Sequence, residues 1–128
     1  MRIHHVAVFV RDLETAREYY EKYFGASANG LYNNPKTGLK TYFLAFEGGG
    51  RLEIMSKPNT AETENSLERI GYSHVSFGVG GKDSVDRITE TLREDGYAVF
   101  SEPRVTGDGY YESCVSDPDG NRVEIVAA

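Results

Sequence analysis

Imidazole and carboxylate side chains recur in this sequence at matching places. The pattern Gly-x-Arg-aliphatic-Glu-Ile runs from Gly49 to Ile54 and again from Gly120 to Ile125. Upstream of each copy stands a strand-like segment that opens with a histidine, so the repeat makes four residues equivalent in pairs: His5 with His74, and Glu53 with Glu124. Neutral imidazoles and carboxylates together suit a divalent metal ion and leave coordination positions for water or substrate. Because no local motif such as H-E-x-x-H is present, the predicted metal site depends on the repeat.

Strand alternation places these four residues on one side of the predicted sheet. In the histidine strands, the valines within 6–10 and their counterparts in the second copy form an aliphatic face, which is expected to pack under a helix. The histidines stand on the opposite face. The aliphatic neighbours of Glu53 and Glu124 face the core, so the glutamates point away from it. By the same parity His4 would face the helix side, and it is interpreted as structural.

Hydrophobic periodicity and turn residues give the order of the elements. Strands are expected at 3–10, 41–46, 51–55, 72–79, 97–100, 110–116 and 122–126, with helices at 13–24 and 83–94, and a short strand and a loop within 26–38. Each copy therefore reads β-α-β-β-β. The predicted class is α+β, in which tandem modules form a curved sheet around a metal cleft. A single domain, 1–128, would consist of modules at about 1–56 and 71–128, joined by a partly helical linker at 57–70.

Composition excludes several classes of protein. The chain has 128 residues and a net charge of -6, and its basic residues are scattered, which argues against nucleic acid as a partner. No apolar run approaches the roughly 20 residues of a membrane helix, and the first strand pattern begins without a preceding apolar signal region. Cys114 is the single cysteine, so no intramolecular disulfide can form. These features predict a soluble cytoplasmic protein without a membrane partner.

The tandem modules and the ending Asp117-Pro118-Asp119-Gly120-Asn121-Arg122-Val123-Glu124-Ile125 resemble the vicinal-oxygen-chelate superfamily of glyoxalases, bleomycin resistance proteins and dioxygenases. The resemblance covers essentially the whole chain. It implies one divalent ion per site, with Zn or Ni first and Co, Mn or Fe as alternatives. The ligands carried over are His5, Glu53, His74 and Glu124. It also implies a homodimer, in which some members complete each metal site from two chains.

The ligand set of two His and two Glu is most similar to the glyoxalase I, or lactoylglutathione lyase, branch. The resemblance implies a lyase or isomerase that acts on a 2-oxoaldehyde thiol adduct, or a similar small carbonyl substrate, by proton transfer through an enediolate. Glu124 would take the proton from carbon and return it to the neighbouring carbon, and Glu53 is the symmetric candidate on the opposite face.

Six residues are candidates for substrate binding: Phe9, Arg51, Thr106, Asp108, Tyr110 and Arg122. Phe9 stands where glyoxalase I proteins commonly have an Arg that helps to bind the glutathione carboxylate, so a different adduct or carbonyl compound is an alternative to a glutathione adduct. Arg51 and Arg122 either bind an anionic substrate or pair with neighbouring carboxylates. The other three residues, Thr106, Asp108 and Tyr110, belong to a loop that corresponds in position to the substrate-contacting loop of the family.

Two other functions stay open. The first is a metal-free binding or resistance module that holds a small drug-like molecule in an aromatic dimer cleft. The second is an Fe(II) ring-cleavage dioxygenase, against which the fourth ligand, Glu53, argues, because those enzymes hold iron with two His and one Glu.

Overall fold

The computed structural model describes residues 1–62 and 70–128. The chain divides into two compact units, Met1–Thr63 (unit 1) and Glu64–Ala128 (unit 2). The predicted linker, 57–70, includes residues 63–69, which lie outside the described part of the chain. Its described residues, 57–62 and 70, form a turn at Pro58 and Asn59 and no helix.

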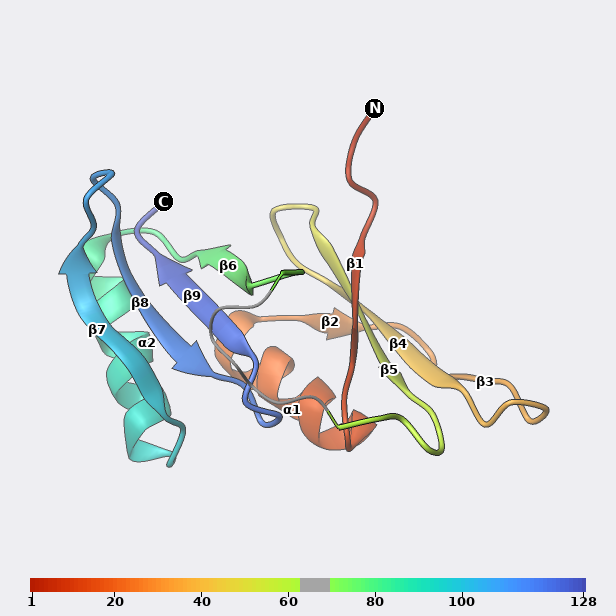
Figure 1. Cartoon of the computed structure of the whole chain (residues 1–128). Coiled ribbons are helices and arrows are strands. Elements are labelled where there is room, and N and C mark those ends of the chain that lie inside the picture. Colours follow the sequence, from red (N-terminus) through yellow and green to blue (C-terminus); the bar gives the residue numbers. More distant parts are fainter. Residues whose placement is uncertain (63–69) are drawn as a thin grey trace. The chain divides into compact units, whose positions relative to one another are not determined.

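Unit 1 is built on a sheet with a helix against it. In chain order its described elements are β1 (Val6–Phe9), α1 (Leu13–Phe24), β2 (Ser27–Ala28), β3 (Tyr32–Asn33), β4 (Lys40–Ala45) and β5 (Arg51–Ser56). The strand order is β1-β5-β4-β2, and the short β3 pairs with β4 (Figure 1). β1 runs parallel to β5, and the other pairs are antiparallel.

Unit 2 repeats this topology. Its described elements are β6 (His74–Gly78), α2 (Lys82–Glu94), β7 (Val99–Val105), β8 (Tyr111–Ser116) and β9 (Arg122–Val126). The strand order is β6-β9-β8-β7, with β6 parallel to β9 (Figure 1). The predicted α+β class with two β-α-β-β-β modules is confirmed, and the hydrogen bonds form one sheet in each unit.

The parallel pair at the edge of each sheet brings the histidine segment beside the glutamate strand. In unit 1, Ala7 is the register partner of Glu53, and in unit 2 Ser76 is the register partner of Glu124. Each glutamate therefore lies beside the residue two positions after the histidine. Since alternate residues of a strand share a face, this register puts His74 on the same side of its sheet as Glu124, and the contact of His5, one residue before β1, with Glu53 shows the same arrangement in unit 1.

The first helix begins and ends where the sequence predicts. The Asp12 carboxylate accepts a hydrogen bond from the Thr15 backbone N–H, at 2.7 Å, and Gly25 ends the helix with φ of 63°. A left-handed residue of this kind is usually glycine, because a Cβ is disfavoured there. Four buried side chains attach the helix mainly to β4 and β5: Leu13, Ala16, Tyr19 and Tyr20.

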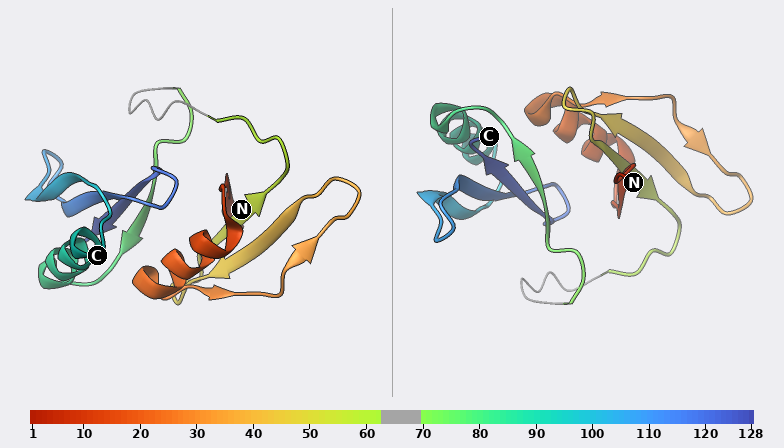
Figure 2. Two further views of the ribbon diagram at one scale, coloured as in Figure 1. Left: turned by 90° about the horizontal axis from the view of Figure 1, so that it is seen from below. Right: turned by 90° about the horizontal axis from the view of Figure 1, so that it is seen from above.

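The second helix packs on the strands of unit 2 through Val85, Thr89 and Leu92, all of them buried. Thr89 Oγ1 donates to the Val85 carbonyl at 2.7 Å, and the same hydroxyl lies 2.7 Å from Ser113 Oγ on β8. Figure 2 shows each helix on one face of its own sheet.

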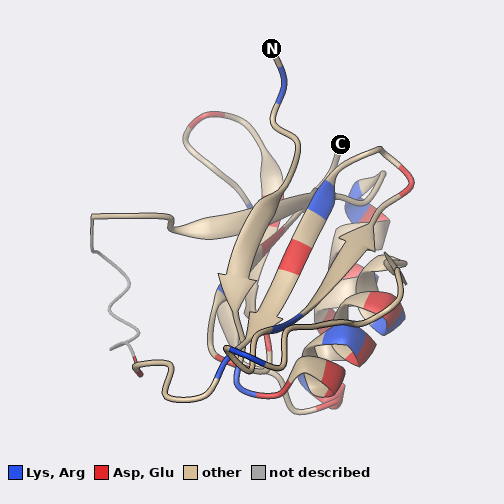
Figure 3. Ribbon diagram, turned by 90° about the vertical axis from the view of Figure 1, so that its right-hand side faces the viewer, with Lys and Arg blue, Asp and Glu red and all other residues tan. Residues whose placement is uncertain are grey.

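Charged residues gather on the helices and are sparse along the strands (Figure 3). None of the described helices is long and apolar enough to cross a membrane.

In unit 1 the helix covers the middle of the sheet more than the edge strand β1. Of the valines predicted to pack under the first helix, Val10 is buried and Val8 half-buried, but Val6 is 38% exposed. The same face of β5 is covered, since Leu52 and Ile54 are buried. The prediction of which residues share a face is thus correct. The prediction that the helix covers Val6 is wrong, because β1 is the edge strand and α1 packs mainly over β4 and β5.

Strand β7 differs most from its prediction at 97–100. It runs from Val99 to Val105 and includes Pro103, with register shifts against β8 between Val99, Ser101 and Arg104. Proline, which cannot donate a backbone hydrogen bond, is tolerated on edge strands and at bulges. β7 is an edge strand, so Pro103 does not end it.

Candidate metal centre

In each unit a histidine ring nitrogen faces a glutamate carboxylate. His5 lies just before β1, and its Nε2 is 3.3 Å from Oε2 of Glu53. His74 opens β6, and its Nε2 is 3.0 Å from Oε2 of Glu124. The side chains are partly exposed to similar degrees, 34% and 17% in the first pair and 38% and 21% in the second. The structure therefore contains two matching His–Glu pairs, one in each unit.

The spacing within each pair fits ligands of one metal ion. Bonds from a metal such as zinc to imidazole nitrogen or carboxylate oxygen are about 2.0–2.2 Å, so two ligand atoms of one ion lie about 2.8–3.6 Å apart. Both Nε2–Oε2 distances fall within this range. An unprotonated Nε2 and a carboxylate oxygen repel each other unless a proton or a cation lies between them. Each pair thus has the donor atoms and the spacing of half of a mixed N/O site.

Nδ1, the ring nitrogen that does not face the glutamate, also has a polar neighbour in each pair. In unit 2, Nδ1 of His74 lies 3.2 Å from the hydroxyl of Ser73. An Nδ1–H that donates to this hydroxyl would leave Nε2 with a free lone pair, which is the tautomer that metal-bound histidines generally use. In unit 1, Nδ1 of His5 lies 2.8 Å from Nδ1 of His4.

The predicted orientation of His4 is wrong. It was expected to face the helix side, but its ring is exposed and contacts the guanidinium of Arg51 at 3.0 Å. The cause is the start of β1 at Val6, since strand alternation does not extend back to His4. The positive charge of Arg51 lowers the pKa of the His4 imidazole.

One pair offers only two ligands. Among the residues that the structure describes, no three His, Cys, Asp or Glu side chains gather into a group that could hold a metal ion. Catalytic zinc sites use three protein ligands and an open position. The four-residue set therefore stays a prediction.

The glutamates differ in their neighbours across the antiparallel hairpin. Phe43 is the register partner of Glu53, and its ring meets the His5 ring edge-on with centroids 5.1 Å apart. Cys114 is the register partner of Glu124. Burial raises the pKa of the Glu124 carboxyl, with an opposing effect of His74, and burial also raises the pKa of the Cys114 thiol. A raised thiol pKa disfavours the thiolate, which is the nucleophilic form of cysteine.

Three of the predicted substrate residues lie on the same sheet faces as the pairs. Arg51 opens β5, two residues before Glu53, and Arg122 opens β9 as the register partner of His74. The Arg122 guanidinium lies 6.0 Å from the Phe100 ring centroid, and its buried Nε has no hydrogen-bond partner among the described residues. Phe9 is the last residue of β1 and is 48% exposed.

The loop that carries the other three lies elsewhere in unit 2. Thr106 and Asp108 hydrogen-bond to each other, and the Thr106 N–H donates to the Tyr110 carbonyl at 2.8 Å. This turn joins β7 to β8 next to the end of β9, where Ala127 N–H donates to the Tyr111 carbonyl. His74 pairs with the start of β9. Within unit 2 the structure thus does not bring Thr106, Asp108 and Tyr110 together with His74.

Sequence reasoning missed Phe43 and Asn29. Alternation within β4 places Phe43 on the face opposite the buried Leu44, and the β4–β5 hairpin register then brings it beside Glu53. This signal was available in the sequence. Asn29, whose Oδ1 accepts the Phe43 backbone N–H at 2.8 Å, follows the two-residue strand β2 and has no comparable pattern.

The fold and its repeated pairs define the class of protein. Residues 2–125 match the family described as the Glyoxalase/Bleomycin resistance protein/Dioxygenase superfamily. The chain belongs to this superfamily, which confirms the resemblance in the sequence. Members of this superfamily typically bind a metal ion, and they include enzymes such as glyoxalase I.

Individual relatives are distant. A Bacillus subtilis protein named as uncharacterized protein YqjT is 29% identical, over 98% of this chain and 98% of its own length. A lactoylglutathione lyase of Haemophilus influenzae is 25% identical, over 98% of this chain and 92% of its own. The structure of the trypanothione-dependent glyoxalase I of Leishmania major has the same fold, with a TM-score of 0.78 at 20% identity, over 98% of this chain and 86% of that chain.

Proposed function

We propose that this chain is a metal-dependent lyase or isomerase of the glyoxalase I type, acting on a 2-oxoaldehyde thiol adduct or a similar small carbonyl substrate. The observation that carries the proposal is the repeated His–Glu pair, with ligand atoms 3.3 and 3.0 Å apart at the same register position of both units. The similarity to lactoylglutathione lyases supports the type of reaction.

The proposed ligands of one divalent ion are His5, Glu53, His74 and Glu124, with Zn or Ni as the first metals to test. Both pairs are needed, because two ligands do not suffice for a catalytic site. The second pair comes either from the same chain or from the partner of the proposed homodimer. A divalent ion bound there would polarise the substrate oxygens and stabilise the negative charge that develops on them.

Side chains of the protein would transfer the substrate proton. Glu124 takes it from one carbon of the substrate and returns it to the next, while Glu53 stands ready for the opposite face. His5 and His74 hold their positions throughout.

The test combines metal content with proton transfer. Wild-type protein purified without chelator is assayed for bound metal, and then for turnover of methylglyoxal with a panel of thiols in deuterated water. Glu124→Gln should retain the fold and lose most turnover. Glu112→Gln is the matched control, because Glu112 lies on the neighbouring β8 and is not a proposed ligand. Unchanged turnover in Glu124→Gln would reject its role as base.

A metal-free binding module is the second candidate. It is favoured by the matched family, whose description includes bleomycin resistance proteins beside glyoxalases. This candidate predicts that the protein acquires no Zn, Ni or Co, and that Glu124→Gln does not alter ligand binding. Oxygen consumption with bound iron would instead indicate a dioxygenase.

A further inference from the structure

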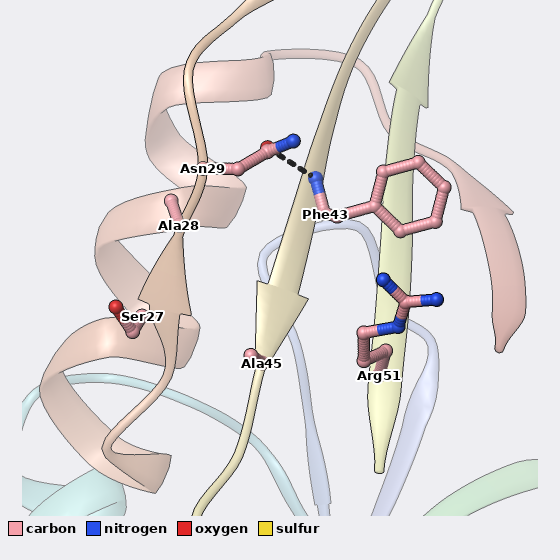
Figure 4. A pocket seen from close by; sticks show the side chains of 6 residues that line it. All are labelled: Ser27, Ala28, Asn29, Phe43, Ala45 and Arg51. Carbon is pink, nitrogen blue, oxygen red and sulfur yellow. Dashed lines mark hydrogen bonds between the residues drawn. The ribbon is translucent and has the colours of Figure 1, made fainter. Parts of the chain in front are cut away.

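A hollow of about 300 Å³ lies on unit 1 beside the His5–Glu53 pair. It is lined by Ser27, Ala28, Asn29, Phe43, Ala45 and Arg51 (Figure 4). Phe43 connects the hollow to the pair, because its ring contacts the His5 ring and its register partner is Glu53. A molecule in the hollow would therefore lie next to one of the proposed metal ligand pairs.

Arg51 supplies a cation that no described carboxylate neutralises. Its guanidinium lies 5.3 Å from the centroid of the Phe43 ring and contacts the His4 ring, and these are its interactions among the described residues. Two other arginines of unit 1 are paired, Arg11 with Glu62 and Arg17 with Glu14 and Glu21. An unpaired, half-buried arginine in a chain of net charge -6 is a good candidate for binding an anion.

The walls of the hollow combine an apolar surface with a few hydrogen-bond donors. The Phe43 ring and the methyl groups of Ala28 and Ala45 are apolar. Asn29 uses Oδ1 to accept the Phe43 N–H, so its amide NH₂ is directed elsewhere as a donor (Figure 4). Small-molecule sites are typically of this kind, with mostly apolar walls and a small number of placed polar groups.

A second hollow of about 290 Å³ adjoins Arg51 on another side. Arg2, Ile3, His4 and Gly49 line it together with Arg51. Neither hollow has a carboxylate among its lining residues. Arg2 therefore adds to the positive potential around Arg51, and nothing in either lining opposes an anion.

We propose that the hollow beside Phe43 binds the carboxylate end of a small, mostly apolar substrate. The planar guanidinium of Arg51 receives the carboxylate through paired N–H donors, and its stacking on Phe43 holds it in place. The apolar body lies on Phe43, Ala28 and Ala45. The inference rests on the proposed function in one respect, because the reacting carbonyl of the same molecule would lie toward the His5–Glu53 pair.

Simple probes test the site without turnover. Benzoate, its uncharged counterpart benzamide, and acetate are titrated into the full-length ¹⁵N-labelled chain, first with chelator and then with Zn. The backbone amides of Phe43 and its neighbours in the hollow report binding. We expect benzoate to bind about tenfold to a hundredfold more tightly than benzamide, the size of a hydrogen bond to a charged group. Acetate, which has no ring to contact Phe43, should bind more weakly than benzoate.

Variants identify the residues responsible. Arg51→Gln should weaken benzoate to the level of benzamide, and Phe43→Leu should reduce the difference between benzoate and acetate. Arg93→Gln removes the same charge from α2, where Arg93 pairs with Glu90 and Glu102, and should leave benzoate binding unchanged. Equal binding of benzoate and benzamide, benzoate shifts outside the hollow, or full benzoate binding by Arg51→Gln would overturn the inference.

The two proposals fail separately. Benzoate binding in the metal-free protein, together with no uptake of Zn, Ni or Co, keeps the carboxylate site and rejects the proposed function. Metal binding with no shifts in the hollow rejects the carboxylate site and leaves the proposed function in place.

Discussion

Loss of any one of the four proposed ligands should weaken metal binding by about the same factor. The structure supplies the reason, because the pairs match in Nε2–Oε2 distance, in the exposure of their side chains and in their register position. Zinc bound by four protein ligands contributes about 10–16 kcal/mol at neutral pH, so one ligand accounts for about 2.5–4 kcal/mol. This corresponds to a dissociation constant about a hundredfold to a thousandfold weaker.

The variants are His5→Ala, Glu53→Gln, His74→Ala and Glu124→Gln, with Glu112→Gln as the control. Competition with a coloured chelator measures the Zn affinity of each, and circular dichroism checks the fold. The two Gln variants keep the shape and one neutral oxygen of the carboxylate, so their losses should lie at the lower end of the range. Thermal stability gives a second measurement, since Zn at a hundred times its dissociation constant stabilises the fold by about 2.7 kcal/mol.

Two results would refute this reasoning. If the unit 1 variants lost Zn affinity and the unit 2 variants kept it, or the reverse, the two pairs would not share an ion. If none of the four variants differed from Glu112→Gln, neither pair would bind metal.

A mixture of a unit 1 variant with a unit 2 variant then shows whether the two pairs of one site come from one chain or from two. Recovery of about a quarter of the wild-type sites by random dimer exchange would show that each site combines pairs of two chains, whereas no recovery indicates one chain or no exchange of subunits.

Three further predictions concern stability, each measured by chemical denaturation. Thr89→Val leaves the buried Ser113 hydroxyl without its 2.7 Å partner and should cost about 1–3 kcal/mol, most of which the double variant with Ser113→Ala should restore. Gly25→Ala should cost about 1–2 kcal/mol, because φ is 63° while the space around the missing Cβ is open. Burial raises the pKa of the Asp117 carboxyl above its ordinary 3.8, so its contribution to the free energy of unfolding should fall as pH rises through the folded-state pKa, and Asp117→Asn should remove that slope.

The sequence was sufficient for the elements that follow strict local rules. Asp12 and Gly25 bound the first helix correctly, and the strand predicted at 122–126 is β9 to the residue. The pairing of His5 with Glu53 and of His74 with Glu124 also followed from the sequence, because a repeat with matching spacing predicts matching register. Strand alternation then determined the shared face.

What could not be predicted depends on contacts between elements. The strand predicted at 97–100 continues to Val105 through Pro103, and the position of β7 at the sheet edge explains why this proline is tolerated. The exposure of Val6 follows from which strands the helix covers, and alternation within one strand carries no such information. His4 was assigned to the wrong side because the start of β1 was placed too early, and its contact with Arg51 joins residues 47 positions apart.

The repeat and its exceptions carry different information about function. Three residues are the same in both units: the histidine, the glutamate, and the arginine two positions before the glutamate. These residues identify the chemistry that both units share. Residues that differ at equivalent positions identify what each unit contacts: Phe43 in unit 1 and Cys114 in unit 2 are the cross-strand partners of the two glutamates. The arginines diverge likewise, since Arg51 borders two hollows, while Nε of Arg122 is buried and the guanidinium lies over Phe100. A metal ion is recognised by identical donors, but an extended substrate has two different ends, so selectivity for the substrate should depend on the positions where the repeat is broken.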